Sequence, residues 1–179
     1  MSNSREEILH TIRKGLKGIG SKDASKERNF ISEAEEIQDL TKGLQNNLRI
    51  QFIDEITNVN TNVLEANGNT KDSTLQLIRE KKLKSFSIWE SEYLKELNLK
   101  ADLKEAGLKL ITAKNKNRIA SSDIGITEVD YAIADTGTLV LLTNKNQPRS
   151  VSLLPPIHLA IVRQENLVRN IKDLFIILK

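Results

Sequence analysis

The sequence contains no cysteine, and this absence excludes three kinds of chemistry. The chain can form no disulfide, has no thiolate nucleophile, and cannot hold an iron–sulfur cluster through thiolates of its own. Aromatic residues are also scarce, at 4%, so the hydrophobic core must be built mainly from Leu, Ile, Val and Ala. A core of this composition is typical of helices packed on a sheet.

Long apolar runs are absent too. No stretch approaches the roughly 20 apolar residues that span a bilayer, and charges such as Arg5, Glu6 and Arg13 interrupt any signal-peptide pattern near the N-terminus. The net charge of +3 arises in residues 1–30, which hold seven Lys/Arg and four Asp/Glu. There is no basic stripe with interleaved aromatics of the kind that binds nucleic acid. We therefore expect a cytoplasmic protein with no membrane span and no nucleic-acid partner.

The patterns that are present predict two parts. Residues 1–28 read as an N-terminal helical arm, with capping-box spacing between Ser4 and Glu7, followed by a polar, flexible link. Residues 29–179 read as the main domain, which begins with a long amphipathic helix from Phe30 that continues to Phe52 and Ile56.

The main domain alternates short apolar strands with helices. Strands are predicted over Thr61–Ala66, Ser85–Trp89, Leu108–Thr112, Val129–Ala134, Thr138–Thr143 and Ile157–Val162. Further helices are predicted over Asp72–Leu83, Glu92–Leu97, Ala101–Ala106 and Asn166–Leu178. This order favours an α/β fold with a parallel sheet. Asp135-Thr136-Gly137 predicts a tight hairpin with Gly137 at positive φ, so we expect an open mixed sheet flanked by helices.

Residues 121–162 contain most of the chemically useful side chains, at positions that read as loops beside buried strands. Gly125 and Gly137 would let backbone N–H groups approach a ligand, and Thr127 adds a hydroxyl. Loops at strand ends are where open α/β sheets bind ligands. The candidate ligand-binding residues are Glu128, Asp130, Asp135, Thr136, Gly137, Thr138, Arg149 and His158.

Each candidate has a structural alternative. The Asp135–Thr138 residues could surround a carboxylate or phosphate, or could serve only the geometry of a turn. Arg149 could clamp a carboxylate or pair with a nearby acid. His158 could act as an acid/base group or as a hydrogen-bonded structural histidine. Glu128 and Asp130 could share a strand face or flank a turn, so no catalytic residue is assigned.

Metal binding is not expected, because the two histidines are far apart in the sequence and have no ligand-type partners.

One segment resembles a known family. The run DIGIT-x-x-DYAIADTGTLVLL, followed by PRSVSLLPPIHLAIV, is similar to the signature of the LUD-domain family, best known in its lactate-utilisation protein C group. The similarity is dense over residues 122–162, and upstream it rests mainly on the order of the elements. The resemblance implies the Rossmann-like open sheet shared with ribose-5-phosphate isomerase, glucosamine-6-phosphate deaminase and CoA-transferase relatives.

The resemblance also implies a role with two iron–sulfur partner proteins in oxidising L-lactate to pyruvate. The iron–sulfur clusters would then reside in the partners only, and this chain would bind no cofactor. Because the family assigns no catalytic residue, whether the chain is itself an enzyme stays open. The alternatives are a stand-alone enzyme or a sensor that binds a small phosphorylated, CoA-linked, folate-like or carboxylate metabolite.

The sequence departs from the family pattern at its end. Relatives usually continue past the last helix with a stretch resembling GPSRTADIE and then a glycine-rich closing strand, whereas this chain ends at Lys179. We expect a sheet edge without its usual C-terminal strand, which a partner or a second copy in a homo-oligomer would cover.

Overall fold

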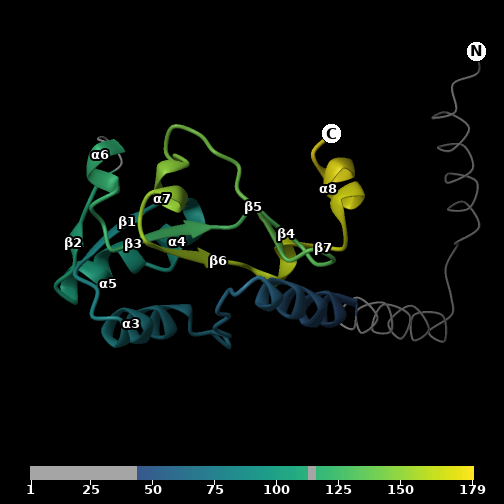
Figure 1. Ribbon diagram of the computed structural model, residues 1–179, viewed down its shortest axis with the longest axis horizontal. Coiled ribbons are helices and arrows are strands. Elements are labelled where there is room, and N and C mark those ends of the chain that lie inside the picture. The colour runs from purple at the N-terminus through teal and green to yellow at the C-terminus, as the bar shows by residue number, and fades with distance from the viewer. Residues whose placement is uncertain (1–43, 113–115) are drawn as a thin grey trace, which may run out of the picture. The chain divides into compact units, whose positions relative to one another are not determined.

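The computed structural model describes residues 44–112 and 116–179, which belong to one compact unit, Leu44–Lys179. Figure 1 shows the order and arrangement of its elements. The predicted arm and link of residues 1–28, and the predicted domain boundary at residue 29, lie outside the described residues.

A four-stranded parallel sheet carries the larger part of the core. Its strands follow the order β2-β1-β3-β6. They are β1 Ser85–Ile88, β2 Lys109–Leu110, β3 Ile124–Glu128 and β6 Ile157–Ile161. Phe86, Ile124 and Ile126 on the two middle strands are fully buried. Such apolar strands, buried on both faces, are characteristic of parallel sheets.

Short helices cover this sheet. They are α3 Thr70–Glu80, α4 Glu92–Glu96, α5 Leu99–Glu105, α6 Lys116–Ile119 and α7 Ser150–Leu153. Asn69 and Ser91 begin α3 and α4 by accepting a backbone N–H with their side chains, as helix N-caps do. In Figure 1, α3 and α7 lie on opposite sides of the parallel strands.

A second, three-stranded sheet follows the order β5-β4-β7. It consists of β4 Tyr131–Ile133, β5 Thr138–Val140 and β7 Leu167–Val168, and α8 Ile171–Ile177 follows β7. A helix over residues 44–58 packs on this part of the protein, since Phe52 and Ile56 form a buried cluster with Val129, Ala132 and Ala134. Ile133, Val168 and Leu174 form a third cluster, so one hydrophobic cluster lies at the parallel sheet and two smaller ones lie at the second sheet.

Most of the predicted architecture is confirmed. The protein is of the α/β class, with a parallel sheet flanked by helices. The β4–β5 hairpin is antiparallel, and Gly137 has a φ of 61°. The helix through Phe52 and Ile56 is present over its described residues, 44–58.

The strand predicted over Thr61–Ala66 is wrong, because these residues form no regular structure. Val63 and Leu64 are exposed, so a sequence with strand-like composition has no neighbouring strand to pair with here.

The segment read as a ligand-facing loop around Gly125 and Thr127 is instead the central strand β3. A Cβ on Gly125 would lie 1.8 Å from the Val151 carbonyl oxygen. This glycine therefore allows α7 to lie directly on β3, and its backbone is covered by protein.

Two further corrections concern the second sheet. The predicted helix over Asn166–Leu178 begins only at Ile171, because Gln164–Asn166 form a 3₁₀ turn (η1) and Leu167–Val168 pair in parallel with β4. The hairpin was expected to join the parallel sheet, but through this pairing it lies in a sheet of its own.

Every helix within the described ranges is too short or too polar to cross a bilayer.

Candidate functional site

Polar side chains gather where the parallel strands end. Glu128 is the last residue of β3, Asp130 follows two residues later, and Arg163 follows the end of β6. Tyr93 lies on α4, just after β1. The carboxyl ends of parallel strands are where open α/β folds hold their ligands. We refer to Tyr93, Glu128, Asp130, Arg163 and Glu165 as the strand-end cluster.

Arg163 organises the strand-end cluster. Its Nη2 lies 3.0 Å from Glu128 Oε1, and its Nη1 lies 3.0 Å from Glu165 Oε1. Its guanidinium carbon is 4.8 Å from the centre of the Tyr93 ring, within the range of a cation–π contact. The remaining donor, Nε, is buried and has no hydrogen-bond partner among the described residues.

Asp130 is the carboxyl group of the cluster best suited to exchange a proton. Its Oδ2 accepts a hydrogen bond from the backbone N–H of Leu142 at 2.7 Å. Burial raises the pKa of Asp130, and the negative charge of Glu128 raises it further, while the Leu142 N–H and Arg163 act in the opposite direction. A raised carboxyl pKa moves proton uptake toward neutral pH, as acid/base groups require.

The structure also shows how Glu128 and Asp130 are related. They do not share a strand, since Glu128 ends β3 and Asp130 lies between β3 and β4. Both nevertheless interact with Arg163, Glu128 through an ion pair and Asp130 through its charge. Of the alternatives that the sequence left open, the flanking arrangement is the observed one.

His158 is the second residue of β6, near the amino end of that strand in the parallel sheet. Its Nε2 and the Oγ1 of fully buried Thr127 are 2.8 Å apart and share a hydrogen bond. His158 is aligned with Gly125 on β3 and remains partly exposed, and the partial burial of its imidazole lowers the pKa. The hydrogen bond is the contact that the second sequence-based alternative, a structural histidine, predicts.

The Asp135–Thr138 turn is accounted for by contacts within the protein. The Thr136 and Thr138 hydroxyl oxygens are 2.9 Å apart, and the Asp135 N–H donates to the Arg169 carbonyl. A Cβ on Gly137 would lie 2.6 Å from the backbone nitrogen of Ile56. The turn therefore packs on the helix of residues 44–58, and it does not contribute to the strand-end cluster.

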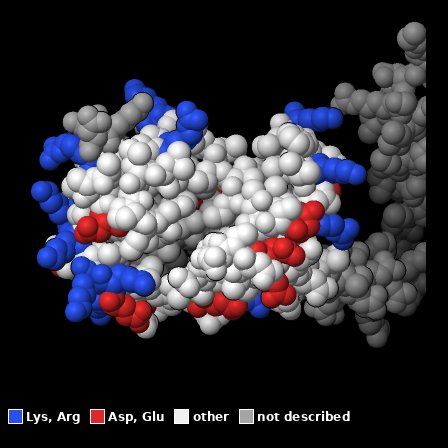
Figure 2. Space-filling view, viewed as in Figure 1, with Lys and Arg blue, Asp and Glu red and all other residues white. Residues whose placement is uncertain are grey.

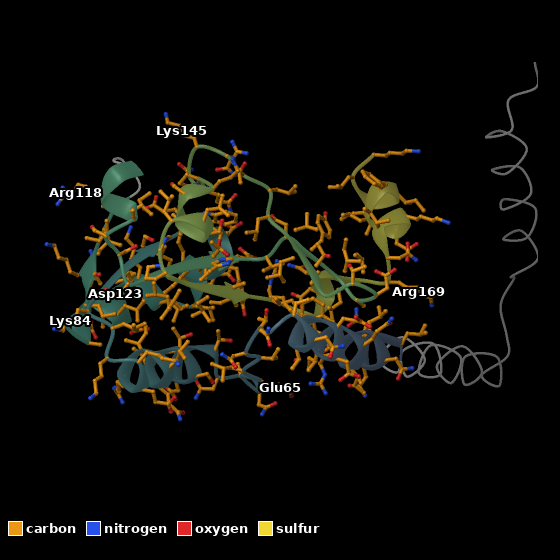
Figure 3. The ribbon with its side chains drawn as sticks, viewed as in Figure 1. Glu65, Lys84, Arg118, Asp123, Lys145 and Arg169 are labelled. Carbon is orange, nitrogen blue, oxygen red and sulfur yellow. The ribbon has the colours of Figure 1, made fainter. Side chains whose placement is uncertain are left out.

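Arg149 lies at a separate hollow beside α7. The hollow has a volume of about 450 Å³ and is lined by Thr143, Asn144, Pro148, Arg149, Ser150, Leu153 and Leu154. The loop over residues 141–148 links it to the strand-end cluster, because this loop begins beside Leu142, which donates to Asp130. Figure 3 shows Lys145 on the same loop, with its side chain pointing away from the protein.

The site thus differs in membership from the predicted one. Glu128 and Asp130 belong to the strand-end cluster, Arg149 lines the hollow, and His158 and the Asp135–Thr138 turn lie outside both. Sequence reasoning missed Tyr93, Arg163 and Glu165. Arg163 follows the predicted strand Ile157–Val162 directly, and this position at a strand end was the signal that could have identified it.

No group of three or more His, Asp or Glu residues within the described ranges could hold a metal ion. In Figure 2, the Lys and Arg side chains lie along the margin of the described part of the face shown, and its middle is largely uncharged.

Comparison with known proteins shows which family this chain resembles. The family model described as LUD domain matches residues 50–179 of this chain. The match includes the strand-end cluster, the hollow and the Asp135–Thr138 turn.

Two curated relatives illustrate the similarity. Lactate utilization protein C of Halalkalibacterium halodurans is 24% identical over 173 residues, which are 94% of this chain and 75% of the relative. Lactate utilization protein B of Bacillus subtilis is 36% identical over 58 residues, which are 32% of this chain and 12% of that protein. A solved structure, that of a DUF162 family protein from Deinococcus radiodurans, has 17% identity and a TM-score of 0.41, over 72% of this chain and 76% of that chain.

Proposed function

Because this chain belongs to the LUD domain family, we propose that it is an accessory or subunit of a system that oxidises L-lactate to pyruvate. In this proposal it acts together with iron–sulfur partner proteins. The observation that carries the proposal is the match of residues 50–179 to the LUD domain, together with a relative named lactate utilization protein C that matches 94% of the chain.

The chemistry of the reaction indicates which component would accept the electrons. Oxidation of L-lactate to pyruvate breaks the C–H and O–H bonds of the alcohol carbon and releases two electrons and two protons. The sequence has no cysteine, so no thiolate-bound cluster of this chain can receive the electrons. In the proposal they pass to the iron–sulfur clusters of the partners. The similarity to lactate utilization protein B, a differently named member of the relatives, supports a system with more than one component.

In this proposal, the strand-end cluster would take up and release the protons of the reaction. Asp130 has a raised pKa and a fixed hydrogen bond to Leu142, and Arg163 lies beside it as a permanent cation. A carboxyl group held in this way can take up and release a proton near the pH at which the system works. The chain would thus contribute proton handling and positioning.

Deletion of the gene tests the role. We expect a deletion strain to grow normally on glucose or pyruvate and to fail on L-lactate as the sole carbon source, with growth restored by the wild-type gene. Full growth of the deletion strain on L-lactate would refute the proposal. A tagged copy purified from lactate-grown cells should bring down proteins whose visible spectra show iron–sulfur clusters.

Two charge-neutralising variants test the strand-end cluster within this function. Asp130→Asn keeps an oxygen that can accept from Leu142 but removes the titrating group, so it should slow growth on L-lactate. Glu105→Gln makes the same change at an exposed position on α5 and should grow like the wild type. Equal growth of both variants would remove Asp130 from the mechanism.

A further inference from the structure

The lining of the hollow beside α7 is mainly apolar, and its one charged residue is Arg149. Thr143, Asn144 and Ser150 are its other polar residues, and none of the seven lining residues is Asp or Glu. Its volume of about 450 Å³ falls within the range of small-molecule sites. The hollow can therefore receive a small ligand, and the guanidinium of Arg149 favours one that carries acceptor oxygens.

Arg149 is an uncompensated cation. It is exposed and forms no ion pair with any described residue, whereas Arg49 pairs with Glu65 and Arg163 pairs with two acids. The sequence left open whether Arg149 pairs with a neighbouring acid or is free for a ligand. Within the described part of the chain, no acid pairs with Arg149, so binding of a ligand carboxylate stays a prediction.

Ser150 supplies a second, independent observation. Its Oγ is buried and has no hydrogen-bond partner among the described residues. A buried hydroxyl without a partner is destabilising, so such groups are rare unless a water or ligand satisfies them. Ser150 lines the hollow beside Arg149, but its Oγ is closed to solvent, so it can reach an oxygen bound to the guanidinium only after its side chain changes rotamer.

The other wall of the hollow is apolar. Leu153 and Leu154 are 73% and 43% exposed, and Pro148 lies with them. Exposed leucines at the edge of a hollow can cover the carbon portion of a ligand. The lining thus matches a molecule with one anionic end and a short apolar body.

Hydrogen bonds hold both walls in place. The Trp89 indole N–H donates to the Pro148 carbonyl at 3.0 Å, next to Arg149. On the facing loop, Asn144 Oδ1 accepts the N–H groups of Asn146 and Gln147 at 2.8 and 3.1 Å. A lining fixed before a ligand arrives loses less conformational entropy on binding.

From these observations we propose that the hollow binds a small organic carboxylate, with Arg149 as the cation and Ser150 as a hydrogen-bond donor. A planar guanidinium matches a carboxylate with two parallel hydrogen bonds, whereas a phosphate dianion usually requires more positive charge than one arginine provides. The carboxylate class rests on the lining. Only the choice of L-lactate and pyruvate as probes rests on the proposed function.

Binding to the full-length, ¹⁵N-labelled protein tests this assignment by NMR. L-lactate, pyruvate and butyrate should shift the backbone amides of the lining residues, and lactamide, which has no charge, should not. Inorganic phosphate is the competing probe. Stronger binding of phosphate than of any carboxylate would overturn the assignment in favour of a phosphorylated ligand, and the absence of shifts with all carboxylates would overturn it outright.

Three variants assign the residues. Arg149→Gln should weaken carboxylate binding at least about tenfold, because a charge-assisted bidentate contact is lost. Ser150→Ala should weaken binding by a smaller factor. Arg169→Gln, which removes an exposed arginine that follows β7 and does not line the hollow (Figure 3 labels it), should bind like the wild type. Equal binding by the Arg149 and Arg169 variants would refute the role of Arg149.

The binding result is separable from the proposed function. If carboxylates bind through Arg149 but deletion of the gene leaves growth on L-lactate unchanged, carboxylate binding in the hollow is supported and the role in L-lactate oxidation is refuted. If deletion abolishes growth on L-lactate but no carboxylate binds, the role is supported and binding in the hollow is refuted.

Discussion

Gly137 lies directly against the backbone of Ile56. A Cβ on Gly137 would approach the Ile56 nitrogen to 2.6 Å and the Ile56 Cα to 2.8 Å, and the residue has a φ of 61°. The turn between β4 and β5 therefore meets the helix of residues 44–58 at a point where a side chain has no room. The glycine that the sequence suggested for ligand approach serves instead to bring a hairpin and a helix together.

Gly137→Ala should destabilise the protein by at least about 2 kcal/mol, since it combines strain at positive φ with a steric conflict. The matched control is Gly68→Ala. Gly68 has a φ of 85°, but nothing lies within 4 Å of its Cβ position, so only the conformational strain of about 1–2 kcal/mol applies. Urea unfolding of the two variants measures the difference. Equal losses would show that the contact with Ile56 contributes nothing.

Local patterns in the sequence were sufficient for much of this architecture. Phe52 and Ile56 are spaced for one face of a helix, and the glycine between two apolar runs indicated the hairpin. These signals act over a few residues, so they survive without knowledge of the rest of the fold.

What the sequence could not indicate depends on distant contacts. Strand β3 contains Gly125 and Thr127, which look like loop residues until α7 covers the glycine and His158 bonds the threonine. Strand β7 is two residues long and exists through its pairing with β4. For the same reason Glu128 and Asp130 could be named as candidates, while their common neighbour Arg163 could not.

Asp123 joins two strands at the amino ends of the parallel sheet. Its Oδ2 accepts the N–H groups of Lys84 and Ser85 at 2.7 and 2.8 Å, and Figure 3 shows Asp123 and Lys84 at the same end of the sheet. The hydrogen bond from Lys84 is the main cause that lowers the pKa of Asp123 below its ordinary value of 3.8. The ionised carboxylate is therefore the form that the folded protein favours.

Asp123→Ala should cost about 0.5–1.5 kcal/mol of stability at pH 7, because the exposed Lys84 N–H and the partly buried Ser85 N–H lose their acceptor. The contribution of the carboxylate is present above its ordinary pKa and is lost as pH falls through the lowered value. The difference in the free energy of unfolding between the wild type and Asp123→Ala should consequently become smaller in strong acid. Asp123→Asn, which retains one acceptor oxygen, should lie between them. A gap that is constant from pH 7 to strong acid would contradict the assignment.

The Thr127–His158 pair predicts a second pH dependence. Burial lowers the pKa of His158 below its ordinary value of 6.5, so the unfolded chain binds this proton more readily than the folded protein. The stability that neutral His158 contributes is complete above pH 6.5 and falls as pH decreases below it. Urea midpoints measured across this range should decrease toward acid in the wild type.

His158→Gln should flatten this dependence, because glutamine can bond the Thr127 hydroxyl but does not titrate. Thr127→Val keeps the histidine and removes its partner, so it should lower stability at all pH values while the slope remains. An unchanged slope in His158→Gln would assign the pH dependence to another group.

Two substitutions in the strand-end cluster should shift the pKa of Asp130 in opposite directions. The folded protein holds the Asp130 proton more readily than the unfolded chain, because burial and the charge of Glu128 both raise the Asp130 pKa, whereas Arg163 lowers it. Glu128→Gln should therefore lower the pKa of Asp130, and Arg163→Gln should raise it. A ¹³C NMR titration of the Asp130 carboxyl measures both shifts, with the Asp123 carboxyl, at the opposite ends of the strands, as the internal control that neither variant moves. Shifts of the same sign in Glu128→Gln and Arg163→Gln would show that the two side chains do not act on Asp130 through their charges.

The raised pKa of Asp130 also means that its ionised form opposes folding. This destabilisation is absent at low pH and complete once pH exceeds the folded-state pKa. Asp130→Asn should accordingly become more stable relative to the wild type as pH rises.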